Sequence, residues 1–214
     1  MTLADIAADC ATEALVICGT APVVPADGLP APIRTIVLLG PQEPAFWHHF
    51  RTSPEAGDGQ PEPLDRWSRR IIGRLACRHG AKAFFPFGGP PWRPFVSWAL
   101  RSGRVHQSPV SLLVHPETGL FFSLRGAIGV PWDLPQDPSP NPCDSCAGRP
   151  CLTACPVGAL SDERYDVATC HNFLDTSPGS VCMDKGCAVR RACPIGRDRR
   201  LPEQAAFHMK AFHP

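Results

Sequence analysis

Cysteines are concentrated in the C-terminal third of this 214-residue chain, where eight of the eleven lie between Cys143 and Cys193. They form two groups, Cys143-x2-Cys146-x4-Cys151-x3-Cys155-Pro156 and Cys170-x11-Cys182-x4-Cys187-x5-Cys193-Pro194. Each group ends with a cysteine followed directly by proline, as in the bacterial run whose last cysteine binds the other of two clusters. The C-terminal third is therefore expected to fold around metal.

Eight thiolates are the number that two four-iron, four-sulfur clusters require, because each cubane takes four thiolate ligands. Closely spaced cysteines can supply three of them, and the fourth comes from elsewhere in the chain. The spacing predicts that Cys193 completes a first cluster, whereas Cys155 crosses over to a second. The ligands predicted for the first cluster are Cys143, Cys146, Cys151 and Cys193. Those predicted for the second are Cys155, Cys170, Cys182 and Cys187.

Zinc is the main alternative, because sites with four cysteines also contain Cys-x2-Cys. Zinc sites usually pair two such knuckles, and only Cys143 and Cys146 have that spacing here. His171 is either a further ligand or an exposed residue of a helix. The cysteines outside this segment stand among apolar residues and are predicted to be buried, inert thiols: Cys10, Cys18 and Cys77.

The start of the chain, Met1-Thr2-Leu3-Ala4-Asp5, has neither the basic segment nor the apolar core of a signal peptide. We therefore expect a cytoplasmic protein, and disulfides are disfavoured in that compartment. No apolar run approaches the length of a membrane span. The formal net charge of +1 argues against strong non-specific binding of nucleic acid. The expected partner is a redox protein, with neither membrane nor nucleic acid involved.

Helices and strands are predicted to alternate before residue 137, which suggests an α/β layer domain. The apolar stripe of Leu64, Trp67, Ile71 and Leu75 predicts a helix over 64–79, ended by Gly80. A β-hairpin is predicted from strands over 110–114 and 120–128. The other predicted elements are helices over 3–14, 43–50 and 94–102, and strands over 15–18, 33–39 and 83–85.

The proline-rich segment 131–142 is predicted to join two domains. The overall class is then α+β, with an N-terminal α/β layer domain over residues 1–137. A small ferredoxin-type domain that holds both clusters is predicted over residues 138–214.

Aromatic residues surround a loop rich in glycine and proline, Pro86-Phe87-Gly88-Gly89-Pro90-Pro91. Glycine allows a backbone to approach a flat ligand, and aromatic rings offer a surface for it. The alternative is that these rings fill the core beneath a stiff loop. Arg125 either binds an anionic group or pairs with a carboxylate. The aromatic residues concerned are Phe84, Phe85, Phe87, Trp92, Phe95 and Trp98.

The segment His115-Pro116-Glu117-Thr118-Gly119-Leu120-Phe121-Phe122-Ser123-Leu124-Arg125-Gly126, followed by the cysteine groups, resembles the core of epoxyqueuosine reductases and reductive dehalogenases. The same segment is also similar to cobalamin-processing proteins. The complete chain looks most like a group of small bacterial ferredoxin-like proteins. These share Leu64-Asp65-Arg66-Trp67-Ser68-Arg69-Arg70 and Phe85-Pro86-Phe87-Gly88-Gly89-Pro90-Pro91.

This resemblance implies a flavin-reductase-like N-terminal domain of corrinoid-reductase ancestry, and clusters that feed electrons to a corrinoid or flavin. Epoxyqueuosine reductases place a proton-donating aspartate a few residues ahead of Pro-x-x-Glu-Arg. Here the corresponding stretch, Pro63-Leu64-Asp65-Arg66, is one residue shorter, and Gln60 falls near the donor position. The carboxylates that could replace the donor are Asp58, Glu62 and Asp65.

The expected function is one-electron transfer by an iron–sulfur protein of ferredoxin type. One alternative is a reductase, epoxyqueuosine-reductase-like or corrinoid-linked, with its own substrate pocket in the N-terminal domain. Another is a binding module folded around zinc. A bound flavin or corrinoid would favour the reductase, and a redox-silent metal would favour the module. No catalytic residue is assigned from the sequence.

Overall fold

The computed structural model describes residues 2–199 and 201–214, and this part of the chain divides into two compact units. Unit 1 comprises the residues up to Val105 together with Ser123–Ser139. Unit 2 comprises His106–Phe122 and Pro140–Pro214. The chain passes from unit 1 to unit 2 for the second time after Ser139, close to the domain boundary expected at residue 137. Residues 106–122, however, are part of the unit that contains the eight clustered cysteines.

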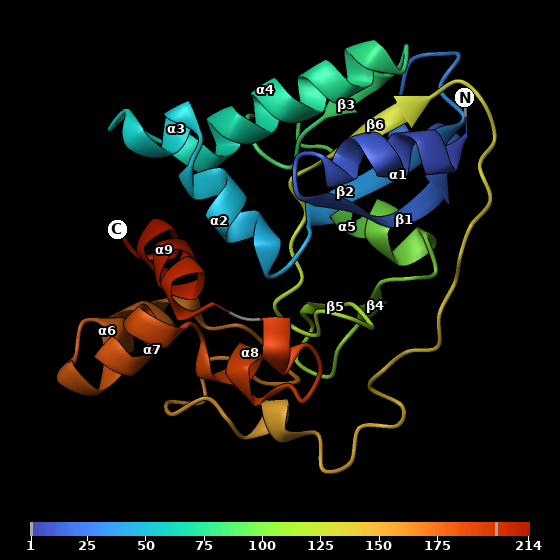
Figure 1. Ribbon diagram of the computed structural model, residues 1–214. Coiled ribbons are helices and arrows are strands. Elements are labelled where there is room, and N and C mark those ends of the chain that lie inside the picture. Colours follow the sequence, from blue (N-terminus) through green and yellow to red (C-terminus); the bar gives the residue numbers. More distant parts are fainter. Residues whose placement is uncertain (1, 200) are drawn as a thin grey trace. The chain divides into compact units, whose positions relative to one another are not determined.

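Unit 1 is built on a four-stranded sheet with the order β1-β2-β6-β3, in which all neighbouring strands are antiparallel (Figure 1). Its strands are β1 (Leu15–Pro22), β2 (Thr35–Pro41), β3 (Lys82–Phe84) and β6 (Gly126–Val130). The central strands β2 and β6 are buried along their whole length, as expected of strands covered on both faces. The fold is therefore α+β with an antiparallel sheet.

Helices cover both faces of this sheet (Figure 1). Gly126 faces α4, because a Cβ atom there would lie 2.7 Å from Cδ1 of Ile72. Phe84 instead packs on Trp98 of α5, with ring centroids 5.8 Å apart. Phe84 pairs with Ala127, the residue after Gly126, and successive strand residues point to opposite faces. The helical elements of unit 1 are α1 (Leu3–Ala11), η1 (Pro25–Asp27), α2 (Ala45–Arg51), α3 (Pro54–Gly57), α4 (Pro63–Arg78) and α5 (Phe95–Arg101).

The helix predicted over 64–79 is confirmed as α4, with Pro63 in its first turn and Gly80 at φ +56° after its end. The predicted apolar stripe is buried. Four of the arginines on the rest of its surface form ion pairs within unit 1: Arg66 with Asp58, Arg70 with Glu55, Arg74 with Glu13 and Arg78 with Asp9.

The Glu55–Arg70 pair makes the stability of unit 1 depend on pH. Arg70 donates from Nε and Nη2 to the two carboxylate oxygens at 2.5 and 2.8 Å, and these bonds lower the pKa of Glu55 from 4.5 to about 2. A lowered pKa adds stability above the unfolded value of 4.5, and the stability is lost as the pH falls through about 2. Because the Arg70 side chain is 43% exposed, we expect the pair to contribute only about 1–2 kcal/mol at neutral pH.

Glu55→Gln should therefore lower the free energy of unfolding at pH 7, and the difference from the wild type should shrink between pH 4.5 and 2. Urea unfolding monitored by tryptophan fluorescence measures this free energy, since all five tryptophans lie in unit 1. A difference that stays the same at pH 2 would contradict the pairing.

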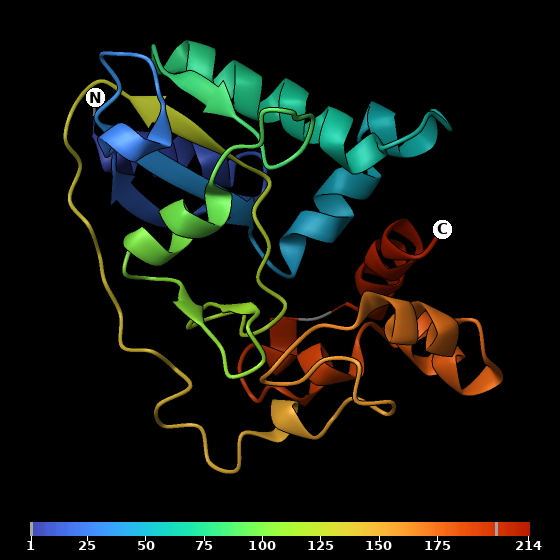
Figure 2. The same cartoon turned by 180° about the vertical axis from the view of Figure 1, so that it is seen from behind.

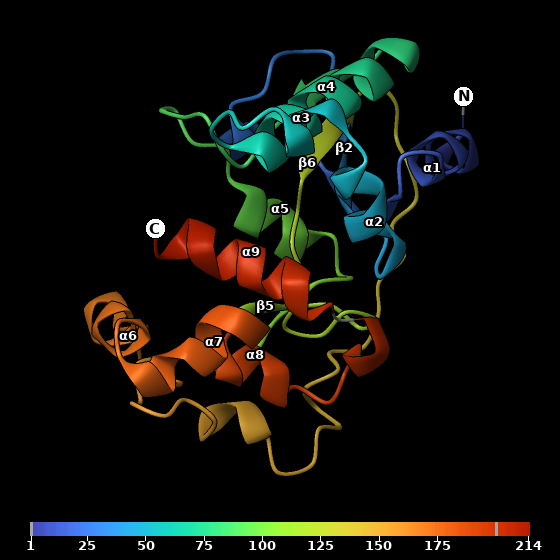
Figure 3. The ribbon, with the colours of Figure 1, turned by 60° about the vertical axis from the view of Figure 1, so that its left-hand side comes forward.

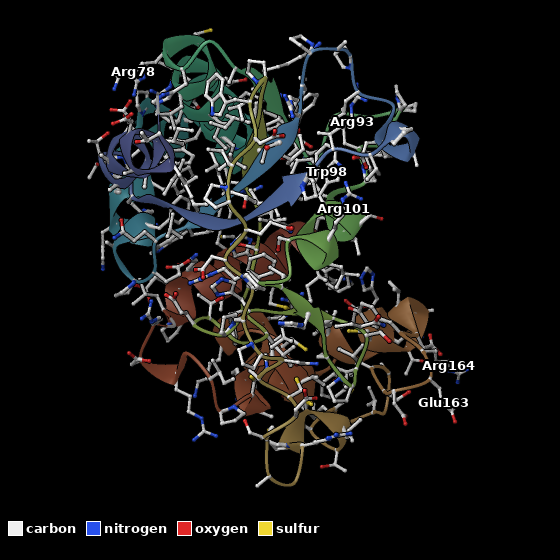
Figure 4. All side chains as sticks on the ribbon, turned by 90° about the vertical axis from the view of Figure 1, so that its right-hand side faces the viewer. Arg78, Arg93, Trp98, Arg101, Glu163 and Arg164 are labelled. Carbon is white, nitrogen blue, oxygen red and sulfur yellow. The ribbon has the colours of Figure 1, made fainter. Side chains whose placement is uncertain are left out.

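Asp27 fixes the position of α5 in unit 1. Trp98 Nε1 donates to one carboxylate oxygen at 3.0 Å, and Arg101 Nη2 donates to the other at 2.6 Å (Figure 4). Burial raises the pKa of Asp27, but hydrogen bonds from the Val24 N–H, Arg101 and Trp98 outweigh it, so the pKa is lowered. The charged carboxylate thereby satisfies the buried indole N–H.

The hairpin predicted from strands 110–114 and 120–128 is wrong. Leu113–Val114 (β5) pairs with His106–Gln107 (β4), whereas β6 lies between β2 and β3. Because β6 is buried, both of its edges need hydrogen-bonding partners, and these two strands provide them. Residues 115–119 form a turn closed by a bridge between His115 and Gly119.

The proline-rich segment after β6 is held against unit 1 over its first part (Figure 2). Thr20 Oγ1 donates to the carbonyl of Pro135 at 2.6 Å. The hydroxyl of Thr35 donates to the carbonyl of Trp132 at 2.9 Å and accepts from the N–H of Leu134 at 3.1 Å. Residues 132–135 thus belong to unit 1 by hydrogen bonding as well as by contact.

Unit 2 contains the two-stranded sheet of β4 and β5 and several short helices, among which α9 packs along α7 (Figure 3). Its helical elements are η2 (Pro150–Leu152), α6 (Val167–Leu174), η3 (Ser177–Gly179), α7 (Ser180–Lys185), α8 (Ala188–Ala192), η4 (Arg197–Arg199) and α9 (Pro202–Phe212). In the part of the chain that the structure describes, no helix combines the length and apolar character needed to cross a membrane.

Candidate metal centres

The first set of thiols comes from the loop before η2, from η2 itself and from the end of α8. The N–H of Cys143 donates to the Asn141 side chain at 3.0 Å, which fixes the start of the loop. Gly148 and Arg149 both have positive φ, at +69° and +39°. These two left-handed residues reverse the chain between Cys146 and Cys151.

Electrostatic interactions identify the members of this set as neighbours. Burial raises the pKa of the Cys143 thiol, and negative charge on Cys151, Cys193 or Cys146 raises it further. Burial raises the pKa of the Cys151 thiol, hydrogen bonds from the backbone N–H groups of Cys151 and Leu152 oppose that rise, and negative charge on Cys146 or Cys193 adds to it. Four thiols of two distant segments, Cys143, Cys146, Cys151 and Cys193, therefore act on one another.

The second set comes from three helical elements and the Cys155-Pro156 turn. Burial raises the pKa of the Cys170 thiol; a hydrogen bond from Tyr165 lowers it, and negative charge on Cys187, Cys155 or Cys182 raises it. Cys170 lies in α6 and Cys182 in α7, while Cys187 is the N-cap of α8. The backbone N–H of Ala159 donates to Cys155 Sγ at 3.2 Å.

Cys193 thus acts on Cys143 and Cys151, and Cys155 acts on Cys170, in agreement with the crossover that the cysteine spacing predicts, while metal binding by these thiols stays a prediction. Two apolar clusters of unit 2 surround most of these thiols, and Cys155 and Cys187 also pack against the cluster around the first set. Cys151 and Cys193 are buried with Val110, Leu120 and Val189. The cluster around the second set contains buried Leu174, Cys182 and Met209, with Cys170 and Cys187 packed against it.

Within residues 2–199 and 201–214, no three or more histidine, cysteine, aspartate or glutamate side chains are arranged so that they could hold a metal ion. Each group offers four thiols and apolar neighbours, which is the ligand set and the shielding that iron–sulfur clusters use.

The turn at residues 115–119 lies directly on the first set. A Cβ atom on Gly119 would lie 2.8 Å from Cys193 Sγ and 2.7 Å from the carbonyl oxygen of Ile195. Gly119 also has φ +59°. On the other side of this contact, a Cβ atom on Gly196 would lie 2.7 Å from the carbonyl oxygen of Glu117. Glycine at both positions allows the turn and the Cys193-Pro194 segment to touch through their backbones.

Two expectations about individual residues are wrong. Cys77 is exposed, because it lies beside the arginine-bearing surface of α4 and not on its buried stripe. His171 is not an exposed helical residue, since its Nε2 is buried and its ring packs edge-on against Phe212 with centroids 4.6 Å apart. Cys10 and Cys18 are buried as predicted.

The six aromatic residues around the loop rich in glycine and proline differ in burial. Phe84, Phe95 and Trp98 are buried in the core, as the alternative to a ligand pocket requires. The indole of Trp92 is 67% exposed and lies on Gly89, where a Cβ atom would approach its ring to 2.7 Å. Phe85 and Phe87 are half-buried, and their rings are tilted against each other by 31° with centroids 5.3 Å apart.

Arg125 pairs with a carboxylate, as one of its two expected roles requires. Its Nη2 donates to Asp65 Oδ1 at 3.0 Å, and Arg125 is almost completely buried. Burial raises the pKa of Asp65, although Arg125 opposes that rise. Of the other carboxylates considered as proton donors, Asp58 is bound to Arg66 and Glu62 is exposed.

Two residues beside the second set were not predicted from the sequence. Tyr165 Oη lies 3.8 Å from Cys170 Sγ and donates a hydrogen bond to it. Burial raises the pKa of this hydroxyl, and the bond to Cys170 raises it further, so the phenol stays protonated. Arg190 lies in α8, and the charge of its guanidinium interacts with Cys187. The available signals were that Tyr165 is the only tyrosine in the chain and that Arg190 stands between two cysteines.

We compared the chain with protein-family models, with curated proteins and with solved structures, and none of the three comparisons gave a match.

Proposed function

We propose that this chain is a ferredoxin-like electron carrier that holds two [4Fe–4S] clusters in unit 2. Cys143, Cys146, Cys151 and Cys193 would bind one, and Cys155, Cys170, Cys182 and Cys187 the other. The observation that carries the proposal is the division of eight thiols into two interacting groups of four. Such clusters take up and release single electrons.

The protein's own contribution is to shield and orient these thiols. Val110, Leu120 and Val189 are buried beside the first set, and Leu174 and Met209 beside the second. Apolar neighbours keep water from the sulfur atoms and so influence the potential of a cluster. The Ala159 N–H and the Tyr165 hydroxyl supply hydrogen bonds to sulfur in the second set.

The proposal includes a redox protein as partner. Unit 2 exposes large apolar side chains close to the second set in sequence or by direct contact. They are Val157, Tyr165, Val167, Val181 and Phe212. Apolar and aromatic side chains at a surface favour protein contacts, and docking there would bring a partner near the second set of thiols. The cytoplasm is the compartment proposed, because thiols stay reduced there.

Anaerobic purification followed by metal and sulfide analysis tests the proposal. We expect about eight iron and about eight acid-labile sulfide per chain, and a brown protein whose colour bleaches on reduction. A C-terminal part that loses its fold when the metal is chelated would agree with this expectation, because ligands and fold form together. About two zinc per chain without sulfide would instead favour the zinc-stapled binding module.

The same preparation decides between a carrier and a reductase with its own substrate. The reductase requires a corrinoid or flavin in a unit 1 of flavin-reductase-like ancestry. Three of the six aromatic residues considered for its pocket are core residues, and Arg125 is paired with Asp65. These observations favour the carrier. A stoichiometric corrinoid or flavin in the purified protein would favour the reductase.

A further inference from the structure

The two sets of thiols differ in the side chains that act on them. Backbone N–H groups donate to sulfur in both sets, to Cys151 in the first and to Cys155 in the second. In the second set, the Tyr165 hydroxyl donates to Cys170 Sγ across 3.8 Å. Tyr165 is held by a backbone bridge to Leu160 and by stacking on Phe212, with centroids 6.2 Å apart and planes 18° from parallel. The phenol is therefore fixed from both its backbone and its ring.

A cation acts on the same set. Arg190 Nη1 donates to the carbonyl of Leu120 at 2.6 Å, and its charge interacts with Cys187 and Tyr165. Among the described residues no carboxylate pairs with Arg190, so its positive charge is not neutralised locally. The comparable cation at the first set is Arg149, which acts on Cys143 but is exposed. Water and salt screen an exposed charge more strongly than a shielded one.

We infer that Tyr165 and Arg190 give the centre of the second set the higher reduction potential of the two. Each is a positioning residue that acts through a ligand sulfur, and the inference rests on the proposed function. Reduction adds one negative charge to a centre. A donor hydrogen bond to sulfur and a nearby cation both stabilise the more negative state. An electron supplied by a low-potential donor protein would then rest mainly on the second set.

Redox titration followed by electron paramagnetic resonance tests this inference on the full chain, with iron and sulfide measured in every sample. Tyr165→Phe keeps the ring on Phe212 and removes only the hydroxyl. We expect the equilibrium constant for reduction of one centre to fall roughly tenfold, which lowers its potential by about 59 mV for one electron. The other potential should stay unchanged. The affected potential should be the higher one.

Arg190 provides the second arm of the test. Arg190→Met should lower the same potential that Tyr165→Phe lowers. Arg190→Lys retains the positive charge, so its potential should stay close to the wild-type value. The matched control is Arg149→Met, which removes an exposed cation near Cys143 and should leave the higher potential unchanged.

The outcomes separate this inference from the proposed function. A wild-type chain without sulfide-bound iron overturns both. Full iron and sulfide in Tyr165→Phe, with both potentials unchanged or with only the lower one shifted, overturns the inference and leaves the carrier intact. A fall confined to the higher potential supports it.

Discussion

Replacing Cys193 with serine is expected to abolish the centre of the first set, although Cys193 stands 42 residues after Cys151 in the chain. Its sulfur is one of the three that act on Cys143 and one of the two that act on Cys151. Cys155→Ser should have the reciprocal effect and abolish the centre of the second set, because Cys155 acts on Cys170. In each variant the iron content should fall from about eight to about four per chain.

Iron and sulfide analysis with paramagnetic resonance of the reduced protein measures both losses. The signal that survives in Cys193→Ser should be the one lost in Cys155→Ser. Cys77→Ser is the matched control, since Cys77 is an exposed thiol outside both sets. Tryptophan fluorescence reports separately that unit 1 remains folded. If Cys155→Ser and Cys151→Ser abolish the same signal, the crossover is wrong.

The sequence predicted the membership of the thiol groups because cysteine spacing limits which ligands one loop can bring together. It also predicted α4, whose stripe of Leu64, Trp67, Ile71 and Leu75 has the helical period. Both patterns are local, or are set by a residue type with few alternative uses.

The errors involve contacts that local patterns do not contain. Residues 120–128 alternate like one strand of a hairpin, yet β6 begins at Gly126 and pairs with β2 and β3. Leu120 instead is buried among the residues around the first set. The segment thus divides between the two units at Ser123, and residues 120–125 contain no glycine or proline that would mark that point in the sequence. Strand partners far away in sequence therefore decide where β6 begins and with which strands it pairs.

Tyr165 and Arg190 show the same limit at the candidate site. A tyrosine near a cysteine is common, and its hydroxyl reaches sulfur here only because Tyr165 is bridged to Leu160 and stacked on Phe212. Arg190 is shielded because its guanidinium binds the carbonyl of Leu120, a residue 70 positions earlier. The neighbours of a thiol are therefore predictable from cysteine spacing, whereas tertiary packing decides which other side chains, such as Tyr165 and Arg190, reach them.

Gly119→Ala is expected to empty the first set of metal while the second keeps its own. An alanine Cβ at this position would lie 2.7 Å from the Ile195 carbonyl oxygen and 2.8 Å from Cys193 Sγ. The first contact is with backbone, which cannot move aside as a flexible side chain does. The turn and the Cys193-Pro194 segment must therefore separate, and Cys193 is withdrawn from its three partners. Iron should fall to about four per chain, with the loss confined to the signal that Cys193→Ser also removes.

Backbone strain alone would also destabilise this variant, because alanine at φ +59° costs about 1–2 kcal/mol. Gly158→Ala isolates that term: Gly158 has φ +64°, but a Cβ atom there would meet nothing within 4 Å. We expect Gly158→Ala to keep about eight iron and to lose only the strain energy, measured by thermal unfolding of the anaerobic protein. Gly119→Ala should lose about 1–3 kcal/mol more, since overpacking adds to strain. Equal stability and equal iron content in the two variants would show that the turn at residues 115–119 does not hold Cys193 in place.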